Sequence, residues 1–358
     1  MTTLNSPLPL RGGPALPNRL ALAPLTNKQS HPDGTLSDQE LAWLIARARG
    51  GFGLTMSAAA FVDPAGQAWV GQLGVSSDAH LPGLRRLADG VRAAGGVSSV
   101  QLHHGGLRAD AAASGRQLVG PWAEESHGAR ALTTAEIAGV VDSFASAAAR
   151  VEHAGVDGVE IHGAHGYLLA QFLDATHNTR EDGYGGDAAG RARIVHEVID
   201  AIRSRTGASF QVGLRLSPER FGLDLHEMVG LTADVLARGD LDYVDLSLWD
   251  VDKLPAGATD GQLLIDHFLG LPRHGTALAV AGHLAGAADA QAVLDKGVDL
   301  VFIGKGAIVD HAFARHALDD AAYTAPAFPV TRDHLRAQYL GEPFVEYFSA
   351  NWPVLVRD

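Results

Sequence analysis

The sequence predicts an α/β fold, a closed (β/α)8 barrel (TIM barrel) with a long insertion after the third strand and a C-terminal extension. First, short apolar runs rich in β-branched residues alternate with longer segments of helical period, making eight strand–helix units. Parallel strands need crossover connections, which the helical segments supply. Second, the alternative doubly wound sheet would place a glycine-rich fingerprint after its first strand, and Pro24-Leu25-Thr26 is unlike one.

The elements follow in order along the chain, within one expected domain covering residues 1–358. The expected strands are residues 20–24, 53–58, 98–103, 158–162, 211–216, 243–248, 277–281 and 300–303. The expected helices are residues 37–49, 78–94, 134–153, 188–206, 225–238, 261–269, 286–296 and 306–311. Two helix starts resemble capping boxes, with Ser37 and Glu40 in one and Thr133 and Glu136 in the other. The barrel is expected at about 18–315, the insertion at 105–132 and the tail at about 325–358.

Composition narrows the function classes. The chain has 28 Lys and Arg against 41 Asp and Glu, and its formal net charge of −13 suits neither nucleic acid nor an anionic membrane. Because there is no cysteine, disulfides, thiolate zinc sites and cysteine-ligated iron–sulfur clusters are excluded. Residues 1–10 show no signal-peptide pattern, and no apolar run reaches the roughly 18 residues of a membrane span, so a cytoplasmic location is expected.

The segment after the fourth strand carries the most chemistry. His162, His165 and Tyr167 lie within six residues, at the strand end where such barrels place their catalytic groups. Imidazole N–H groups can hold a carbonyl oxygen, and a phenol can deliver a proton. Two other interpretations stay open here. One is ordinary local hydrogen bonding, and the other is a metal-dependent lyase or isomerase using Glu160, His162 and His165.

Other strand ends are typical of a site for a mononucleotide cofactor. Gln101 ends the third strand and offers an amide to a ring imide edge. Arg215 ends the fifth, where its partner is either a carboxylate such as Glu160 or a cofactor that becomes anionic on reduction. Gly282, Gly304 and Lys305 follow strands seven and eight, a recurrent position for a phosphate cradle. No dinucleotide fingerprint is present, which favours a mononucleotide.

These motifs closely resemble the Old Yellow Enzyme family of FMN-dependent ene-reductases (NADH:flavin oxidoreductases), over nearly the whole chain from residue 18 to about 313. Residues 18–26 read NRLALAPLT, 162–173 read HGAHGYLLAQFL and 178–186 read NTREDGYGG. The resemblance implies tightly bound, non-covalent FMN and a nicotinamide hydride donor, NADH or NADPH. It implies flavin-ring contacts from Pro24, Leu25, Thr26, Ala59, Gln101, His162 and Arg215. Gly282, Gly304 and Lys305 should hold the phosphate.

The resemblance also implies a reaction. Hydride passes from FMN N5 to the β-carbon of an α,β-unsaturated aldehyde, ketone or related activated alkene. His162 and His165 bind the carbonyl oxygen, and Tyr167 protonates the α-carbon. Lys305 replaces the family's usual arginine, and Thr26 stands where one branch has cysteine. Asn27 and Lys28 replace the more usual aromatic or arginine, leaving the substrate pocket open.

The tail, residues 331–358, is rich in aromatic side chains for a chain with only 6% aromatics. The first interpretation is packing against the outer helices, because aromatic side chains mostly serve burial. The second is that the tail covers an active-site mouth, either its own or that of a neighbour, because related enzymes often form such dimers. A homodimer is therefore one expected arrangement.

Overall fold

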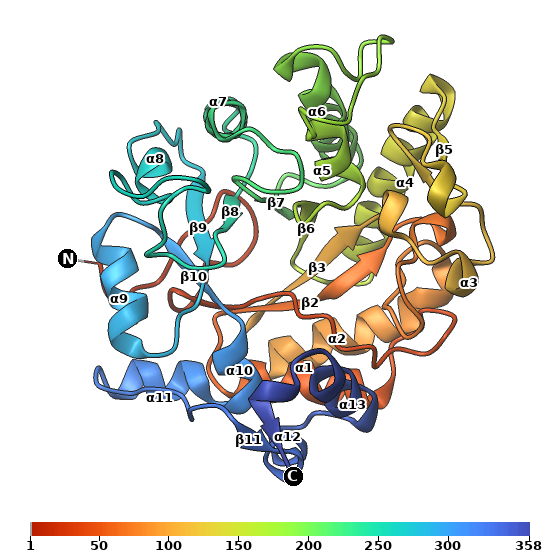
Figure 1. The fold of residues 1–358 in the computed structure, drawn as a ribbon. Coiled ribbons are helices and arrows are strands. Elements are labelled where there is room, and N and C mark those ends of the chain that lie inside the picture. Colours follow the sequence, from red (N-terminus) through yellow and green to blue (C-terminus); the bar gives the residue numbers. More distant parts are fainter. Residues whose placement is uncertain (1) are drawn as a thin grey trace.

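Eight parallel strands close into a barrel in the computed structural model, which describes residues 2–358 (Figure 1). The order around the barrel is β1-β10-β9-β8-β7-β6-β3-β2, so the predicted fold class is confirmed. The strands are β1 (Leu20–Leu22), β2 (Leu54–Phe61), β3 (Val97–His103), β6 (Gly158–Gly163), β7 (Gln211–Leu216), β8 (Tyr243–Ser247), β9 (Ala277–Ala281) and β10 (Leu300–Ile303).

Helices surround this barrel, and all but the last two of them connect successive strands. They are α1 (Asp38–Arg49), α2 (Leu81–Ala93), α4 (Thr134–His153), α5 (Leu168–Leu173), α6 (Ala188–Arg205), α7 (Leu225–Ala237), α8 (Asp266–Leu269), α9 (Ala287–Asp295), α10 (Lys305–Val309) and α11 (Phe313–Asp319). Most match the expected ranges. The helix expected at 261–269 shrinks to α8, because Gly261 adopts φ +103° and the Asp266 carboxylate accepts from Leu263 N before the helix begins.

One of the two expected capping boxes is complete. Thr133 Oγ1 accepts from Glu136 N, and Glu136 Oε2 accepts from Thr133 N at 2.9 Å. At Ser37 only half of the box forms. Its hydroxyl accepts from Glu40 N at 3.1 Å, but the Glu40 side chain is buried and bonds to the loop after β1 instead.

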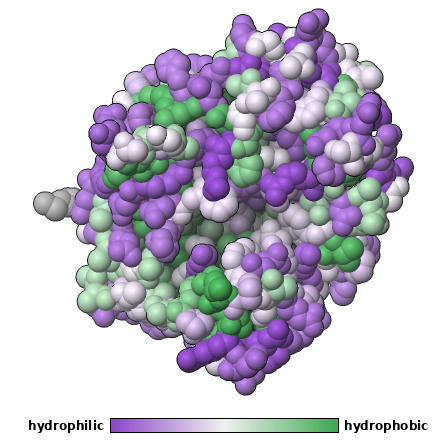
Figure 2. Space-filling view, in the orientation of Figure 1, coloured by the Kyte–Doolittle hydropathy of each residue, from purple (hydrophilic) through white to green (hydrophobic). Residues whose placement is uncertain are grey.

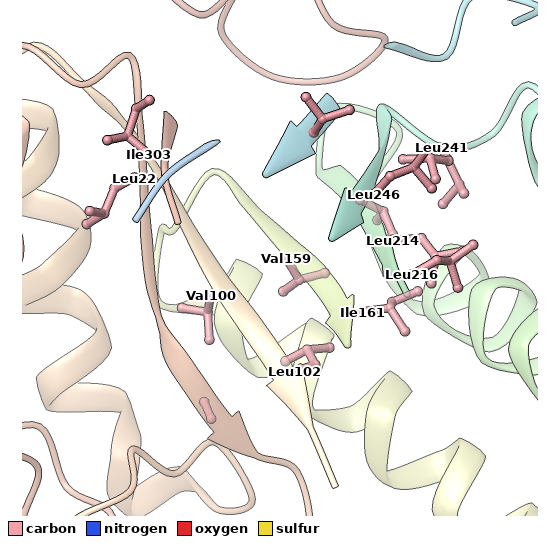
Figure 3. Close-up of a cluster of buried hydrophobic side chains, with 14 of the residues drawn as sticks. Leu22, Val100, Leu102, Val159, Ile161, Leu214, Leu216, Leu241, Leu246 and Ile303 are labelled. Atoms are coloured by element: carbon pink, nitrogen blue, oxygen red, sulfur yellow. The ribbon is translucent and has the colours of Figure 1, made fainter. Parts of the chain in front are cut away.

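On β6, β7 and β8 the side chains alternate between an apolar outer face and a polar inner face. Figure 3 shows Val159 and Ile161 of β6 and Leu214 of β7 in the buried hydrophobic cluster. The residues between them, including Glu160, have the opposite direction on the pleated strand and point into the barrel. This alternation brings functional groups from neighbouring strands together inside the barrel.

The N-terminal segment packs across the opposite end of the barrel. Leu8 and Leu16 form an antiparallel bridge and pack with Leu54, Tyr243 and Leu300, the first residues of three strands. Gly12 N donates to Asp242 Oδ1 at 2.7 Å, and Gln211 Nε2 donates to Gly12 O at 3.0 Å. The floor of the barrel is therefore filled.

The insertion and the tail add small elements at the rim. The insertion contains α3 (Ala111–Ser114) and two short parallel strands, β4 (Val119–Gly120) and β5 (Arg130–Ala131). The tail contains β11 (Val330–Thr331), α12 (Arg332–Ala337), α13 (Glu342–Asn351) and β12 (Val356–Arg357). Helix α13 lies beside α1 (Figure 1), and its buried Phe344 meets Trp43 edge-on at 5.0 Å between ring centroids. Within residues 2–358, no helix has both the length and the apolar character needed to cross a membrane.

Candidate active site

The predicted site residues gather at one end of the barrel. Gln101 on β3 pairs in register with Glu160 on β6, and His162 on β6 pairs with Arg215 on β7. The remaining predicted site residues lie at or just beyond the ends of β1, β2, β6, β9 and β10, and are Pro24, Leu25, Thr26, Ala59, His165, Tyr167, Gly282, Gly304 and Lys305. The space-filling view shows a hollow near the middle of this face (Figure 2).

His162 and His165 form a chain of hydrogen bonds. Ala164 N donates to His162 Nδ1 at 3.2 Å, which leaves the proton of a neutral His162 on Nε2. That nitrogen lies 3.2 Å from His165 Nδ1, and His165 Nε2 lies 2.7 Å from Ser247 Oγ. Burial lowers the pKa of both imidazoles well below the usual value; the other imidazole and then Arg215 add to the effect at His162, and Arg215 does so at His165. Both are therefore neutral donors at pH 7.

Tyr167 stands at the start of α5 between two neighbours, His103 at the end of β3 and Arg108 in the segment that follows β3. The His103 ring lies 4.3 Å from the Tyr167 ring centroid, and the Arg108 guanidinium lies 4.7 Å from it. Arg108 also donates to the backbone oxygen of His165, so this one side chain contacts both His165 and Tyr167. Burial raises the pKa of Tyr167 and Arg108 opposes that shift, so the phenol keeps its proton at neutral pH.

The proton position on His103 is fixed by Gln72. Ala68 N donates to Gln72 Oε1 at 2.7 Å, which orients the amide so that Nε2 donates to Ala59 O and to His103 Nδ1 at 3.0 Å. His103 therefore carries its proton on Nε2, a buried nitrogen with no partner within residues 2–358. Burial lowers the pKa of His103 well below the usual value, so this third imidazole is also neutral.

Two carboxylates and one arginine lie beneath these groups. Gln101 Nε2 donates to Glu160 Oε1 at 2.6 Å, and Arg215 Nε lies 2.9 Å from Asp245 Oδ2. The protein partner of Arg215 is thus a carboxylate, Asp245 in place of the example Glu160, because Arg215 and Asp245 are register partners on adjacent strands. Burial and the neighbouring Asp245 raise the pKa of Glu160 to about 8, although Arg215 opposes the shift.

These contacts bear on the metal interpretation. Glu160 turns to Gln101, while His162 and His165 turn to each other and to Ser247. Over residues 2–358, no group of three or more His, Cys, Asp or Glu side chains is arranged to hold a metal ion. The Glu160, His162 and His165 ligand set therefore has no support from the geometry.

The same end of the barrel fits a flat ring with a phosphate tail. Arg215 contacts the protein through Nε and, at 3.4 Å, through Nη2 to Ser247 Oγ, so part of its five-donor fork remains for a ligand. A Cβ placed on Gly304 would meet only Leu25, at 3.8 Å, which indicates open space beside it. Next to it, Lys305 is exposed and forms no ion pair with the residues that the structure describes. These residues match the requirements of FMN.

Comparisons with known proteins agree with this geometry. Residues 4–322 match the NADH:flavin oxidoreductase / NADH oxidase family. The Bacillus subtilis protein named "Probable NADH-dependent flavin oxidoreductase YqiG" is 38% identical over 319 residues, covering 86% of this chain and 85% of that protein. The NADH:fumarate oxidoreductase of Klebsiella pneumoniae is 33% identical over 84% of this chain, which spans only 34% of that longer protein.

Solved structures are similar over nearly the whole chain. Morphinone reductase in complex with tetrahydroNAD superposes with a TM-score of 0.79 and 29% identity, covering 100% of this chain and 98% of that one. The Old Yellow Enzyme homologue from Zymomonas mobilis gives a TM-score of 0.81 and 26% identity over 96% and 99% of the two chains.

Proposed function

Since the chain belongs to the NADH:flavin oxidoreductase / NADH oxidase family, we propose that it is an ene-reductase acting on α,β-unsaturated aldehydes, ketones and related activated alkenes. Its cofactors are FMN and a nicotinamide hydride donor, as the family implies. When bound, FMN would supply hydride transfer between NAD(P)H and the β-carbon of the alkene, and Arg215, Gly304 and Lys305 are among the residues that would hold it. The observation that carries the proposal is the placement of one phenol and two imidazoles together: the ring centroids of Tyr167 and His162 lie 5.2 Å apart, and His162 Nε2 lies 3.2 Å from His165 Nδ1.

The residues of the chain divide the remaining work. His162 holds the carbonyl oxygen through Nε2–H and His165 holds it through Nδ1–H. The substrate oxygen must therefore replace the contact between His162 Nε2 and His165 Nδ1, and the Ser247 hydroxyl must donate to His165 Nε2 so that the His165 proton lies on Nδ1. Tyr167 gives its proton to the α-carbon, and Arg108 beside its ring stabilises the phenolate that results. Arg215 would stabilise the ring edge that becomes anionic when the flavin is reduced. Held in place beforehand, these groups lower the barrier through orientation and electrostatics.

Tyr167→Phe tests the proton-donor role. In anaerobic stopped-flow measurements, FMN reduction by NAD(P)H should stay within about twofold of wild type, while reoxidation by 2-cyclohexenone slows roughly 10²-fold or more, the usual contribution of a positioned general acid. Tyr184→Phe is the matched control, because that phenol donates to Glu197 away from the site. An unchanged reoxidation rate in Tyr167→Phe would contradict the role.

His162→Ala tests the oxygen clamp. A phenol such as 4-hydroxybenzaldehyde should bind the oxidised flavoprotein with a charge-transfer absorbance, and its Kd should rise about 10- to 100-fold in the variant, since a hydrogen bond to a charged group contributes about 1.5–3 kcal/mol. His226→Ala removes an exposed imidazole on α7 and serves as the control. Equal affinity in wild type and His162→Ala would rule the clamp out.

Organisation beyond the site also stays a prediction. We propose that the chain forms one domain and a homodimer in the cytoplasm. Light scattering coupled to size-exclusion chromatography would measure the mass of the assembly against the 37.5 kDa of one chain.

A further inference from the structure

Lys28 occupies a constrained place at the barrel mouth. It lies on the loop after β1 with φ +55°, a left-handed conformation that is uncommon for a residue other than glycine. The loop is held on both sides of it. Asn27 Nδ2 donates to buried Glu40 at 3.0 Å, Asn27 Oδ1 accepts from Gln29 N at 2.9 Å, and Ser30 N donates to Gly71 O at 3.1 Å. Such strain persists where the surroundings enforce it, often at ligand sites.

The C-terminal tail supplies the aromatic ring that contacts Lys28. Lys28 Nζ lies 5.1 Å from the ring centroid of Tyr347 on α13. The residue before α13 is fixed to the same loop, because Gly341 N donates to Gln29 Oε1 at 2.7 Å. Burial raises the pKa of Tyr347, the Tyr167 phenol raises it further, and the Thr26 hydroxyl opposes the shift. The contacts of Lys28 with Tyr347 and of Gln29 with Gly341 join the loop after β1 to α13. The tail therefore reaches the mouth of its own barrel.

The Lys28 ammonium has no anionic partner within residues 2–358. Among residues 2–358, no carboxylate oxygen lies within 4.0 Å of its Nζ, although the chain has 41 acidic residues. Glu40 on α1, which binds the same loop, accepts from Asn27 and Ser30 through its two oxygens. A half-buried cation that rests only on an aromatic face is incompletely compensated, so an anion arriving beside it is favoured.

We propose that Lys28 and Tyr347 form an anion subsite that selects alkenes carrying a carboxylate as well as the reacting carbonyl. This inference rests on the proposed ene-reductase function. With the carbonyl oxygen at His162 and His165, the carboxylate lies toward the loop after β1, where Lys28 binds it and Tyr347 holds the ammonium in position. Lys28 is thus a specificity-determining residue, and Tyr347 is a positioning residue.

The test compares an acid with its own neutral ester in the FMN-loaded enzyme. The probes are (E)-4-oxopent-2-enoate and its methyl ester, and the readout is the ratio of kcat/KM for the acid to that for the ester. Lys28→Met should lower this ratio about 10-fold through KM of the acid, the effect of losing one partly buried charge contact. Lys28→Arg should restore it, and Lys296→Met, an exposed lysine after α9, should leave it at the wild-type value.

Two further variants and a binding assay isolate the role of Tyr347. Tyr347→Ala should lower the acid-to-ester ratio, while Tyr347→Phe, which keeps the ring face under Lys28, should keep it. In binding to the oxidised flavoprotein, 4-hydroxybenzoate should lose affinity in Lys28→Met by more than 4-hydroxybenzaldehyde does.

The outcomes separate this inference from the proposed function. If neither probe reoxidises the reduced wild-type enzyme, the ene-reductase function fails. If both are reduced and Lys28→Met leaves their ratio unchanged, the anion subsite alone is wrong. If Lys28→Met instead slows FMN reduction by NAD(P)H, the cation serves the diphosphate of that donor, and the carboxylate assignment is overturned.

Discussion

Among single residues, Gln72 influences the active site indirectly, through its hydrogen bond to His103. Its amide is oriented by Ala68 N and Ala59 O, and it leaves His103 only one neutral form, with the proton on Nε2. That form places a neutral donor nitrogen in the group of rings around Tyr167 and His162. A buried amide therefore controls the protonation of an imidazole at the site.

Gln72→Leu should destabilise the protein. The change leaves Ala68 N and His103 Nδ1 without their partners, and each buried unsatisfied polar group costs about 1–3 kcal/mol. Urea unfolding would measure the loss, which should appear as a lower midpoint with an unchanged slope. Gln117→Leu, at an exposed amide in the insertion, should have little effect. Equal midpoints for the two variants would contradict this account of Gln72.

Some residues of the site could be predicted from the sequence, and others could not. His162, His165 and Tyr167 form a local motif, so their joint position at the mouth could be read from spacing. Gln72 and Arg108 could not, because their roles depend on partners far along the chain: Gln72 lies 31 residues from His103, and Arg108 lies 57 residues from His165. Asp245 was missed as the partner of Arg215 because strand register is not visible in sequence.

Among the secondary-structure elements, the turn from β10 into α10 carries the proposed phosphate cradle. Gly304 separates the last strand from Lys305, the first residue of α10, and Lys305 is exposed. A single cation there offers charge to a phosphate without the two-pronged geometry of arginine.

Lys305→Met should weaken FMN binding without weakening the fold. We expect the Kd for FMN, from fluorescence quenching on titration, to rise about 10-fold, as for the loss of one charge-assisted hydrogen bond. The midpoint of unfolding of the flavin-free protein should not change, since Lys305 contacts no carboxylate within residues 2–358. Lys305→Arg should bind FMN at least as tightly as wild type. A wild-type Kd in Lys305→Met would remove Lys305 from the cradle.

Element boundaries were predictable where one signal dominated. The strands at 211–216, 277–281 and 300–303 agree with the expected ranges, because short β-branched runs there are bounded by polar residues and glycine. The helix expected at 261–269 failed because the Asp266 carboxylate binds Leu263 N and thereby starts the helix late. At Ser37 the capping box is incomplete, because the Glu40 side chain is buried and bonds to Asn27 and Ser30 instead of the Ser37 backbone.

For the whole molecule, the polar interior of the barrel has consequences for stability. Glu160 and Asp245 are both fully buried, and only Arg215 supplies a nearby positive charge. The pKa of Glu160, raised to about 8 chiefly by burial, means that the folded protein holds a proton which the unfolded chain releases at much lower pH. Glu160 therefore favours folding less as the pH rises from the unfolded value toward 8.

Glu160→Gln should remove this pH dependence. The wild-type unfolding free energy should carry a downward contribution between about pH 5 and 8, because the folded state binds more protons there. Glutamine keeps an oxygen to accept from Gln101 but cannot ionise, so the variant should show a flatter profile and a relative gain above pH 8. Thermal unfolding from pH 5 to 9 would measure both, with Glu346→Gln on the exposed face of α13 as control. Parallel profiles for Glu160→Gln and wild type would contradict the raised pKa.

The barrel as a whole was predictable because eight strand–helix units leave few other arrangements. The positions of the two chain ends were not, since neither belongs to the repeating pattern. Two partners set them: Asp242 holds the N-terminal segment under the barrel, and Gln29 holds the start of α13 at the mouth.

The filled floor has a kinetic consequence. Because Leu8 and Leu16 close one end of the barrel, molecules can reach the interior only through the opposite opening. The nicotinamide donor and the alkene must then enter through the same opening. The oxidised nicotinamide therefore has to leave before the alkene enters. Steady-state plots at several fixed donor concentrations should therefore be parallel lines, and an excess of either substrate should inhibit by occupying the form of the enzyme meant for the other.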